Sequence, residues 1–412
     1  MVKRLSNAVQ SKFATNYRRS FRGGRENQRL TTLKETAMPC RSLPADILDL
    51  IVDHLRDNPV TLEACCLVSK SWILRTRRHR FSFIELANSN TIKSWIRAFP
   101  DPSNSPAHHT RKLRIRSLET IAAADALIHI HSFHRLTELK LQMYGPESRR
   151  VTLAQLHGLS PALKSLLLSY SFVPPWEVLD LICSFPLLED LSLRSGEAES
   201  SAKGWNVPPV SPRFTGSLRL VHNNSTVARR LFDLPNGLHF SKIILVFPTE
   251  DMEFTRDLVL RCSETMEFLR IDYYPSMFPP ISLPLAKTLS LLIGPFVDEL
   301  PLPLDLSNAT KLRDVEIWWS GNDAQWIAIT LQTAPSKSLQ QITLRVFTNF
   351  PAGSLTEERL REWGEVDHSL VQLWTSRSIL PKVLYYDYQG GTVPKLFPEF
   401  MKKGVVREAG CD

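Results

Sequence analysis

Apolar residues recur through the middle of the chain in a short phrase, LxxLxL, where they alternate with polar ones. Its clearest copies are LTELKL, LKSLLL, LEDLSL, MEFLRI, LRDVEI and LQQITL, which begin at residues 136, 163, 188, 266, 312 and 339. Weaker copies begin at residues 110, 215, 240 and 286, so that consecutive phrases start 20 to 27 residues apart. Each phrase predicts a short strand with its apolar side chains on one face, because side chains alternate between the two faces of a strand.

A period in the twenties with this phrase at its start is typical of leucine-rich repeats, in which a strand and a return segment form one unit. Each unit can bury its apolar face only against stacked neighbours, which predicts a solenoid of parallel strands with a period of about 26 residues. Strict repeats carry Asn or Cys three residues after the last apolar position. This chain has other residues there, which predicts an irregular solenoid; they are Tyr144, Ser171, Gly196, Tyr274 and Ser320.

A different pattern precedes the repeats, between residues 43 and 81. Pro44 stands where a helix can begin, and a break at residues 57–59 separates it from a second helix, for which Thr61 is a candidate cap. The apolar positions at helical spacing are Ile47, Leu48, Ile51, Val52 and Leu55 in the first helix, and Leu62, Cys65, Val68 and Trp72 in the second. So short a helical module has too little interior to bury all of these side chains, which predicts apolar surface available to a partner.

The LxxLxL phrase does not recur after Phe347. Residues 354–374 predict an amphipathic helix and residues 383–388 predict one more strand. A solenoid needs such a cap, because its last repeat otherwise exposes a core face. The predicted architecture is α/β: a basic tail (1–40), a three-helix module (41–86), a linker (87–107), the repeats (108–350) and a C-terminal cap (351–412).

The net charge of +8 is concentrated in the tail. Residues 1–41 hold ten Lys or Arg against two Glu, so the rest of the 412-residue chain is formally neutral. A neutral body argues against a nucleic-acid-binding protein, whose basic footprint should lie on the folded domain. For the tail, three interpretations stay open: a disordered solvated arm, a nuclear-import or anion-binding patch, and a mitochondrial presequence.

Composition and motifs point away from catalysis. The six cysteines form no CxxC pair and no dense framework, as expected for reduced thiols of a cytoplasmic or nuclear protein. No apolar run approaches the roughly 18–20 residues of a membrane helix. His129, His131 and His134 are the best metal-like cluster, but no second pair of ligands accompanies them. The sequence lacks the common phosphate-binding, hydrolase and metalloprotease motifs, so we expect no enzyme, no metal and no cofactor.

The helical module resembles an F-box, the segment of about 40 residues by which substrate receptors dock on the Skp adaptor of SCF (Skp–cullin–F-box) ubiquitin ligases. The likeness rests on the Leu43-Pro44 entry, the apolar stripe that follows, Leu62 and the VSKSW phrase that ends at Trp72. An F-box followed by irregular leucine-rich repeats is a receptor layout common in fungi. The resemblance implies an adaptor-binding set made of Leu43, Pro44, Ile47, Leu48, Ile51, Leu55, Leu62, Val68 and Trp72.

What the resemblance implies for function is a non-catalytic substrate receptor that holds a protein substrate and reaches a cullin-RING ligase through the adaptor. The alternative is an interaction scaffold of the same fold that acts outside ubiquitin ligation. A third class, an enzyme or nucleic-acid-binding protein, rests only on the tail and the histidines. For the substrate, residues between and just after the apolar positions of each phrase should line the concave face; the candidates are Arg114, Arg116, Lys140, Arg194, Arg270 and Trp318.

Overall fold

The computed structural model describes residues 44–68, 70–116, 129–143, 153–157, 159–171, 173–195, 211–221, 225–246, 252–272, 286–293, 304–319, 324–334, 338–348, 356–377, 381–387, 393–402 and 406–408. The basic tail (1–40) and Leu43 lie outside these residues. The chain divides into two compact units, residues 1–163 and 164–412, and each is described by itself.

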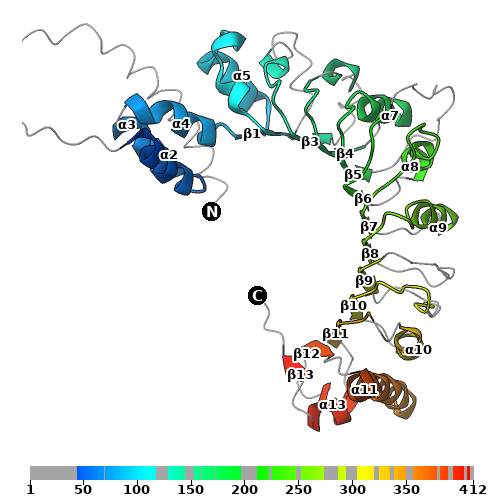
Figure 1. The fold of residues 1–412 in the computed structure, drawn as a ribbon. Helices are drawn as coiled ribbons and strands as arrows, with labels where there is room; N and C mark the ends of the chain where they lie inside the picture. Colours follow the sequence, from blue (N-terminus) through cyan, green and yellow to red (C-terminus); the bar gives the residue numbers. More distant parts are fainter. Residues whose placement is uncertain are drawn as a thin grey trace, which may run out of the picture. The chain divides into compact units, whose positions relative to one another are not determined.

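The first unit begins with three helices, α2 (Ala45–His54), α3 (Pro59–Val68) and α4 (Lys70–Arg80) (Figure 1). The Pro44 carbonyl accepts the backbone N–H groups of Ile47 and Leu48 at 3.0 and 3.2 Å, so α2 starts where the sequence predicts. Helix α3 begins at Pro59, two residues before Thr61, so Thr61 does not cap it. The Asn58 side chain caps the helix instead, because it accepts the Thr61 N–H at 3.1 Å.

A short parallel sheet follows, with strands β1 (Phe83–Leu86), β2 (Lys112–Ile115) and β3 (Glu138–Met143) in chain order. Strand β1 pairs with β2 as a repeat strand would, although it precedes the first predicted phrase. The sheet therefore begins inside the range assigned to the helical module.

The range 87–107 differs from the linker expected there, because it contains helix α5 (Ser89–Ala98) and the 3₁₀ turn η1 (Pro102–Asn104). Asn88 and Thr91 form a capping box, in which each side chain accepts the other's backbone N–H at 3.0 and 3.1 Å. Trp95 packs against Phe81 and Phe133, with ring centroids 6.2 and 5.7 Å apart. A good cap and buried aromatic surface make this segment part of the fold.

The second unit is built on parallel strands that pair in chain order. The strands are β4 (Ser165–Tyr170), β5 (Asp190–Ser195), β6 (Ser217–Val221), β7 (Lys242–Val246), β8 (Phe268–Asp272), β9 (Thr288–Ile293), β10 (Asp314–Trp319), β11 (Gln341–Thr348), β12 (Lys382–Asp387) and β13 (Val406–Glu408). Strands β2 to β11 each begin two residues after the start of a predicted phrase. The repeat prediction is confirmed at every phrase, and the architecture is α/β with a parallel, solenoid-type sheet.

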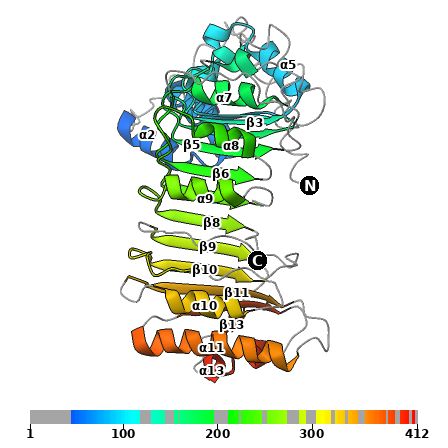
Figure 2. The same cartoon turned by 90° about the vertical axis from the view of Figure 1, so that its right-hand side faces the viewer.

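Return helices cover one face of this sheet (Figures 1 and 2). They are α7 (Pro175–Cys183), α8 (Ser225–Leu231), α9 (Met252–Arg261), α10 (Gln325–Thr333) and α11 (Glu357–Arg377). The apolar positions of the phrases, such as Leu191 and Leu193, are almost fully buried beneath them. At the start of a strand, two consecutive N–H groups share one carbonyl of the preceding strand, as Glu189 and Asp190 share that of Lys164 at 2.8 and 2.9 Å.

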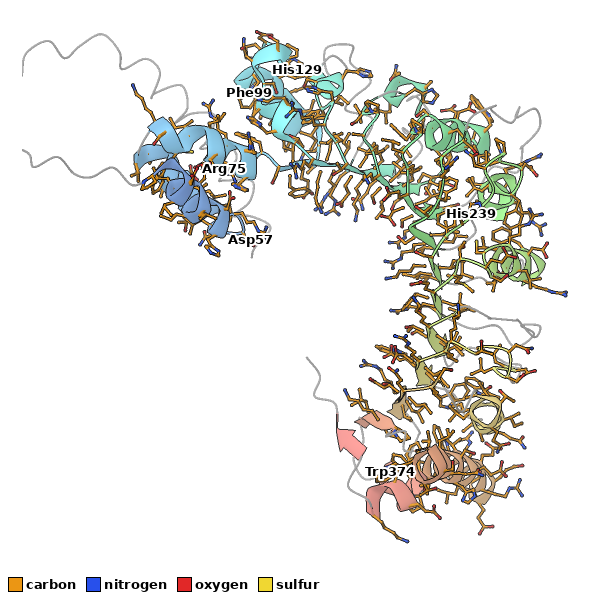
Figure 3. All side chains as sticks on the ribbon, in the orientation of Figure 1. Asp57, Arg75, Phe99, His129, His239 and Trp374 are labelled. Atoms are coloured by element: carbon orange, nitrogen blue, oxygen red, sulfur yellow. The ribbon has the colours of Figure 1, made fainter. Side chains whose placement is uncertain are left out.

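The predicted cap is present as α11, α12 (Val393–Leu396) and α13 (Pro398–Lys402). Trp363 of α11 is fully buried against Phe397, and Trp374 lies 5.9 Å from the ring of Phe400 (Figure 3). The Asp367 carboxylate accepts the backbone N–H groups of Glu399 and Phe400 at 2.8 and 3.1 Å, which joins α13 to α11.

Candidate functional site

The helices of the first unit leave much apolar surface exposed. Of the apolar residues described in α2, α3 and α4, only Val52, Leu62 and Cys65 are buried. Large apolar side chains remain in solvent on all three helices: Ile47, Leu50 and Ile51 on α2, Val60, Leu67 and Val68 on α3, and Leu74 on α4. On α3 the exposed fractions reach 84% for Leu67, 75% for Val60 and 69% for Val68. We call these seven residues the apolar surface of the helical module.

The residues expected to contact an adaptor divide into three groups in the structure. Ile47, Ile51 and Val68 are exposed and belong to the apolar surface, and Pro44 is exposed beside it. Leu48, Leu55 and Trp72 are half-buried, and Leu62 is internal. Sequence reasoning missed Leu50, Val60, Leu67 and Leu74, whose signal was only that they are large apolar residues off the predicted stripes.

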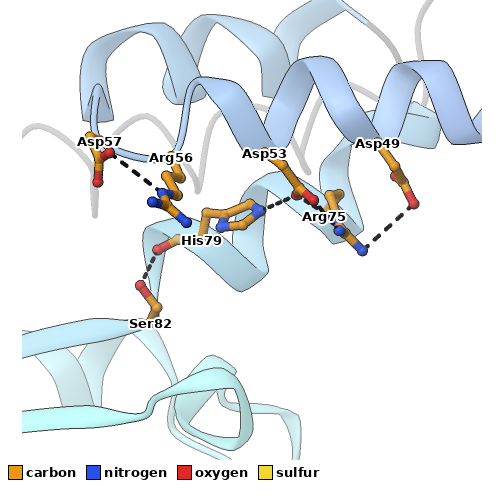
Figure 4. A network of polar contacts seen from close by, with 7 residues as sticks. All are labelled: Asp49, Asp53, Arg56, Asp57, Arg75, His79 and Ser82. Carbon is orange, nitrogen blue, oxygen red and sulfur yellow. Dashed lines mark hydrogen bonds and ion pairs between the residues drawn. The ribbon is translucent and has the colours of Figure 1, made fainter.

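An ionic cluster holds α2 against α4 (Figure 4). Arg75 Nε donates to Asp53 Oδ1 at 2.7 Å, and His79 Nε2 lies 2.6 Å from the same oxygen. Arg75 also approaches Asp49, with Nη1 3.7 Å from Oδ2. The hydrogen bond from Arg75, with that from His79, holds the pKa of the Asp53 carboxyl well below its usual range. These contacts fix the orientation of α2 and therefore the direction in which Ile47, Leu50 and Ile51 face.

Cations gather where α4 meets the 3₁₀ turn η2 (Pro106–His109). The rings of His108 and His109 lie 3.9 Å apart, and Arg77, Arg78 and Arg135 act on His109 from α4 and from the segment before β3. Burial first, and then repulsion from these positive charges, lowers the pKa of His109 from 6.5 to about 4.

On the sheet of the first unit, three predicted substrate contacts lie together. Arg114 is directly opposite Lys140 in register, and Arg116 follows at the end of β2. Glu85 of β1 forms an ion pair with Arg116 and lies 4.0 Å from Arg114, while Arg114 also donates to Gln142 at 3.4 Å. The expected basic stripe is therefore partly neutralised by Glu85, which sequence reasoning missed.

The predicted contacts of the second unit lie on three separate strands. Arg194 (β5) is exposed, and Arg270 (β8) is held by Asp272 through a bond of 2.6 Å between Nε and Oδ1. Trp318 (β10) is half-buried beneath the guanidinium of Arg345, whose carbon lies 4.3 Å from the ring centroid. Arg345 also donates to Glu316 at 2.6 Å, so that Trp318 belongs to a cluster formed within the chain.

Groups with catalytic chemistry are dispersed. His129 is buried whereas His131 and His134 are exposed, and no three metal-ligating side chains among the described residues are placed to hold an ion. Burial raises the pKa of the Cys262 thiol to about 11 and that of Cys183 to about 12, which suppresses thiolate formation. In the described part of the chain, no helix combines the length and apolar character needed to cross a membrane.

Comparison with known proteins adds little to this geometry. No family model matches the chain, and no curated protein matches it in sequence. Eighteen chains of solved structures match it in fold. One belongs to the crystal structure of the Rad7 and Elc1 complex in yeast, with 13% identity and a TM-score of 0.34 over 100% of this chain and 98% of that chain. A likeness at that TM-score carries no argument about the function of this chain.

Proposed function

We propose that the chain is the non-catalytic substrate-recognition subunit of an SCF-type ubiquitin ligase. Helices α2 to α4 would dock on a Skp-type adaptor, and through it on a cullin-RING ligase. The sheet face opposite the helices would bind a protein substrate. The observation that carries the proposal is the apolar surface of the helical module. The proposal needs no catalytic residue, metal or cofactor in this chain, and it places the chain in the cytoplasm or nucleus.

Physical reasoning supports docking at the helices. Exposed apolar side chains on neighbouring helices are costly in water unless a partner covers them, because each large side chain gains about 1.5–3 kcal/mol when it is fully buried. An amphipathic helix that fits a groove uses apolar anchors three and four residues apart, and Ile47, Leu50 and Ile51 have this spacing. The ionic cluster around Asp53 holds that helix in place before a partner arrives.

The experiment is co-purification of the full chain with a Skp-type adaptor. The Ile47→Ser/Val68→Ser variant removes two exposed apolar residues of the helical module, and we expect it to recover at least tenfold less adaptor than the wild type. The matched control is Leu187→Ser/Leu260→Ser, which removes two exposed apolar residues of the second unit and should leave recovery unchanged. The variant Leu43→Ala/Pro44→Ala changes the N-terminal start of the helical module, and we expect it to recover less adaptor than the wild type as well.

Thermal melting of each variant separates loss of docking from loss of folding. Equal recovery of adaptor by the wild type and by all variants, at either a high or a background level, would contradict the proposal. Adaptor binding without cullin recruitment or ubiquitin transfer in a reconstituted reaction would favour the scaffold that acts outside ubiquitin ligation.

A further inference from the structure

Two arginines occupy neighbouring strands on the exposed sheet face of the second unit. In the register of the sheet, Arg219 of β6 lies opposite Ser192 of β5, and Arg194 follows Ser192 by two residues on the same face. Neighbouring strands are about 4.8 Å apart and two residues along a strand span about 6.6 Å, so the two Cα atoms lie roughly 8 Å apart. Both side chains are exposed.

These two arginines differ from the others on the exposed sheet faces. Arg116 pairs with Glu85, Arg270 with Asp272 and Arg345 with Glu316. Among the described residues, the side chains of Arg194 and Arg219 form neither an ion pair nor a hydrogen bond. A partner can therefore use the charge of these two side chains without first breaking a contact with another described residue.

The pair has aliphatic neighbours on β6 and β7, and the serines Ser169 and Ser192 beside it on β4 and β5. Val221 lies opposite Arg194, and Ile244 lies opposite Arg219 on the next strand. Val246 of β7 lies opposite Val221 of β6, and both valine side chains are less than a tenth exposed. The backbone N–H groups of β5 and β6 are engaged with strands on both sides, so the charged donors available here are the two guanidinium groups.

From this arrangement we infer that Arg194 and Arg219 form a docking patch for an extended acidic segment of a protein partner, with carboxylates on alternate residues and aliphatic side chains beside them. Carboxylates two residues apart in an extended segment are about 6.6–7 Å apart, which two flexible arginines can match. Each guanidinium can hold one carboxylate through two parallel hydrogen bonds. Phosphate sites usually add free backbone N–H groups, which β5 and β6 lack. This inference rests on the proposed function, since it names the chemistry of the substrate.

The test uses three fluorescein-labelled peptides with alternating valine: one with glutamate, one with glutamine and one with phosphoserine at the other positions. Fluorescence polarisation measures their binding to the full chain at low and high salt. We expect the glutamate peptide to bind best, and its affinity to fall as salt rises. In Arg194→Gln/Arg219→Gln the affinity should fall roughly tenfold, which corresponds to about 0.7 kcal/mol for each partly exposed ion pair.

The control variant Arg230→Gln/Arg256→Gln removes the same charge from α8 and α9 on the helix-covered face, and it should bind the glutamate peptide like the wild type. Equal affinity of both double variants, or a preference for the glutamine or phosphoserine peptide, overturns the inference. Adaptor co-purification of the same two variants is measured in parallel, and both should retain it. Failure of the wild type to bind adaptor refutes the proposed function, whereas the peptide result alone decides the docking patch.

Discussion

The helical module and the repeats place their large apolar residues in opposite environments. In β5 the apolar positions Leu191 and Leu193 are almost fully buried, and the residues that alternate with them, Asp190, Ser192 and Arg194, carry charged or hydroxyl groups. In α3 only Leu62 and Cys65 are buried, while Val60, Leu67 and Val68 lie in solvent. An internal repeat has stacked neighbours that cover its core face, whereas a bundle of three short helices does not. The strand leucines of the repeats are therefore buried within the chain, whereas most large apolar side chains of α3 are left in solvent.

The strongest test of this contrast compares two leucines. Leu193→Ala removes a fully buried side chain and should lower the free energy of unfolding of the second unit by about 2–5 kcal/mol. Leu67→Ala removes a side chain that is 84% exposed and should change stability by less than about 0.5 kcal/mol. Urea unfolding of both variants measures the difference. A large loss for Leu67→Ala would mean that α3 is covered within the chain itself.

A second test uses acid, because the helical module ends beside a concentration of positive charge. His109 has its pKa lowered from 6.5 to about 4 in the folded chain, so between those values the unfolded chain binds a proton that the folded chain does not. The free energy of unfolding of the first unit should therefore fall as the pH falls from about 6.5 to about 4. In His109→Gln this part of the pH dependence should disappear.

Urea unfolding at several pH values between 7 and 4 measures this prediction. If the wild type and His109→Gln lose stability in parallel over that range, burial and the nearby positive charges do not lower the pKa of His109 in the folded chain.

The smallest effect is expected on the exposed sheet face, where charged side chains contribute little to stability. Arg345→Gln removes an ion pair with Glu316 and a contact with the Trp318 ring, and it should cost about 0.5–1 kcal/mol. Arg194→Gln removes a side chain with no ionic partner among the described residues and should be neutral. Thermal melting compares the two variants, and an equal cost would mean that Arg194 has a structural contact of its own.

The repeats could be predicted from the sequence because their signal is local. Alternation within six residues predicts a strand, and the recurrence of the phrase predicts the stacking. The pairing of charges could not be predicted in the same way. Glu85 and Arg116 lie on neighbouring strands, so their contact depends on a register that only the fold determines. Arg345 and Glu316 illustrate the same limit, because Arg345 of β11 contacts Glu316 of the adjacent strand β10, which is two residues away from its own register partner, Trp318.

The helical module shows a different limit. Periodicity identifies the stripe that contains Leu62 and Val68, but only the packed helices show that Leu62 is internal and Val68 exposed. The 87–107 range looked like a linker because it contains Pro, Ser and Asn. The capping box of Asn88 and Thr91, three residues apart, was the overlooked signal for α5.

The parallel register of the second unit has a consequence for how such a protein can change over evolutionary time. Ser192, Arg219, Ile244 and Arg270 stand side by side in one exposed row, each contributed by a different repeat. A substitution at one of them leaves the buried leucines of its own strand untouched. Selection can therefore alter the recognition surface one strand at a time, while the interior that keeps the repeats stacked stays constant.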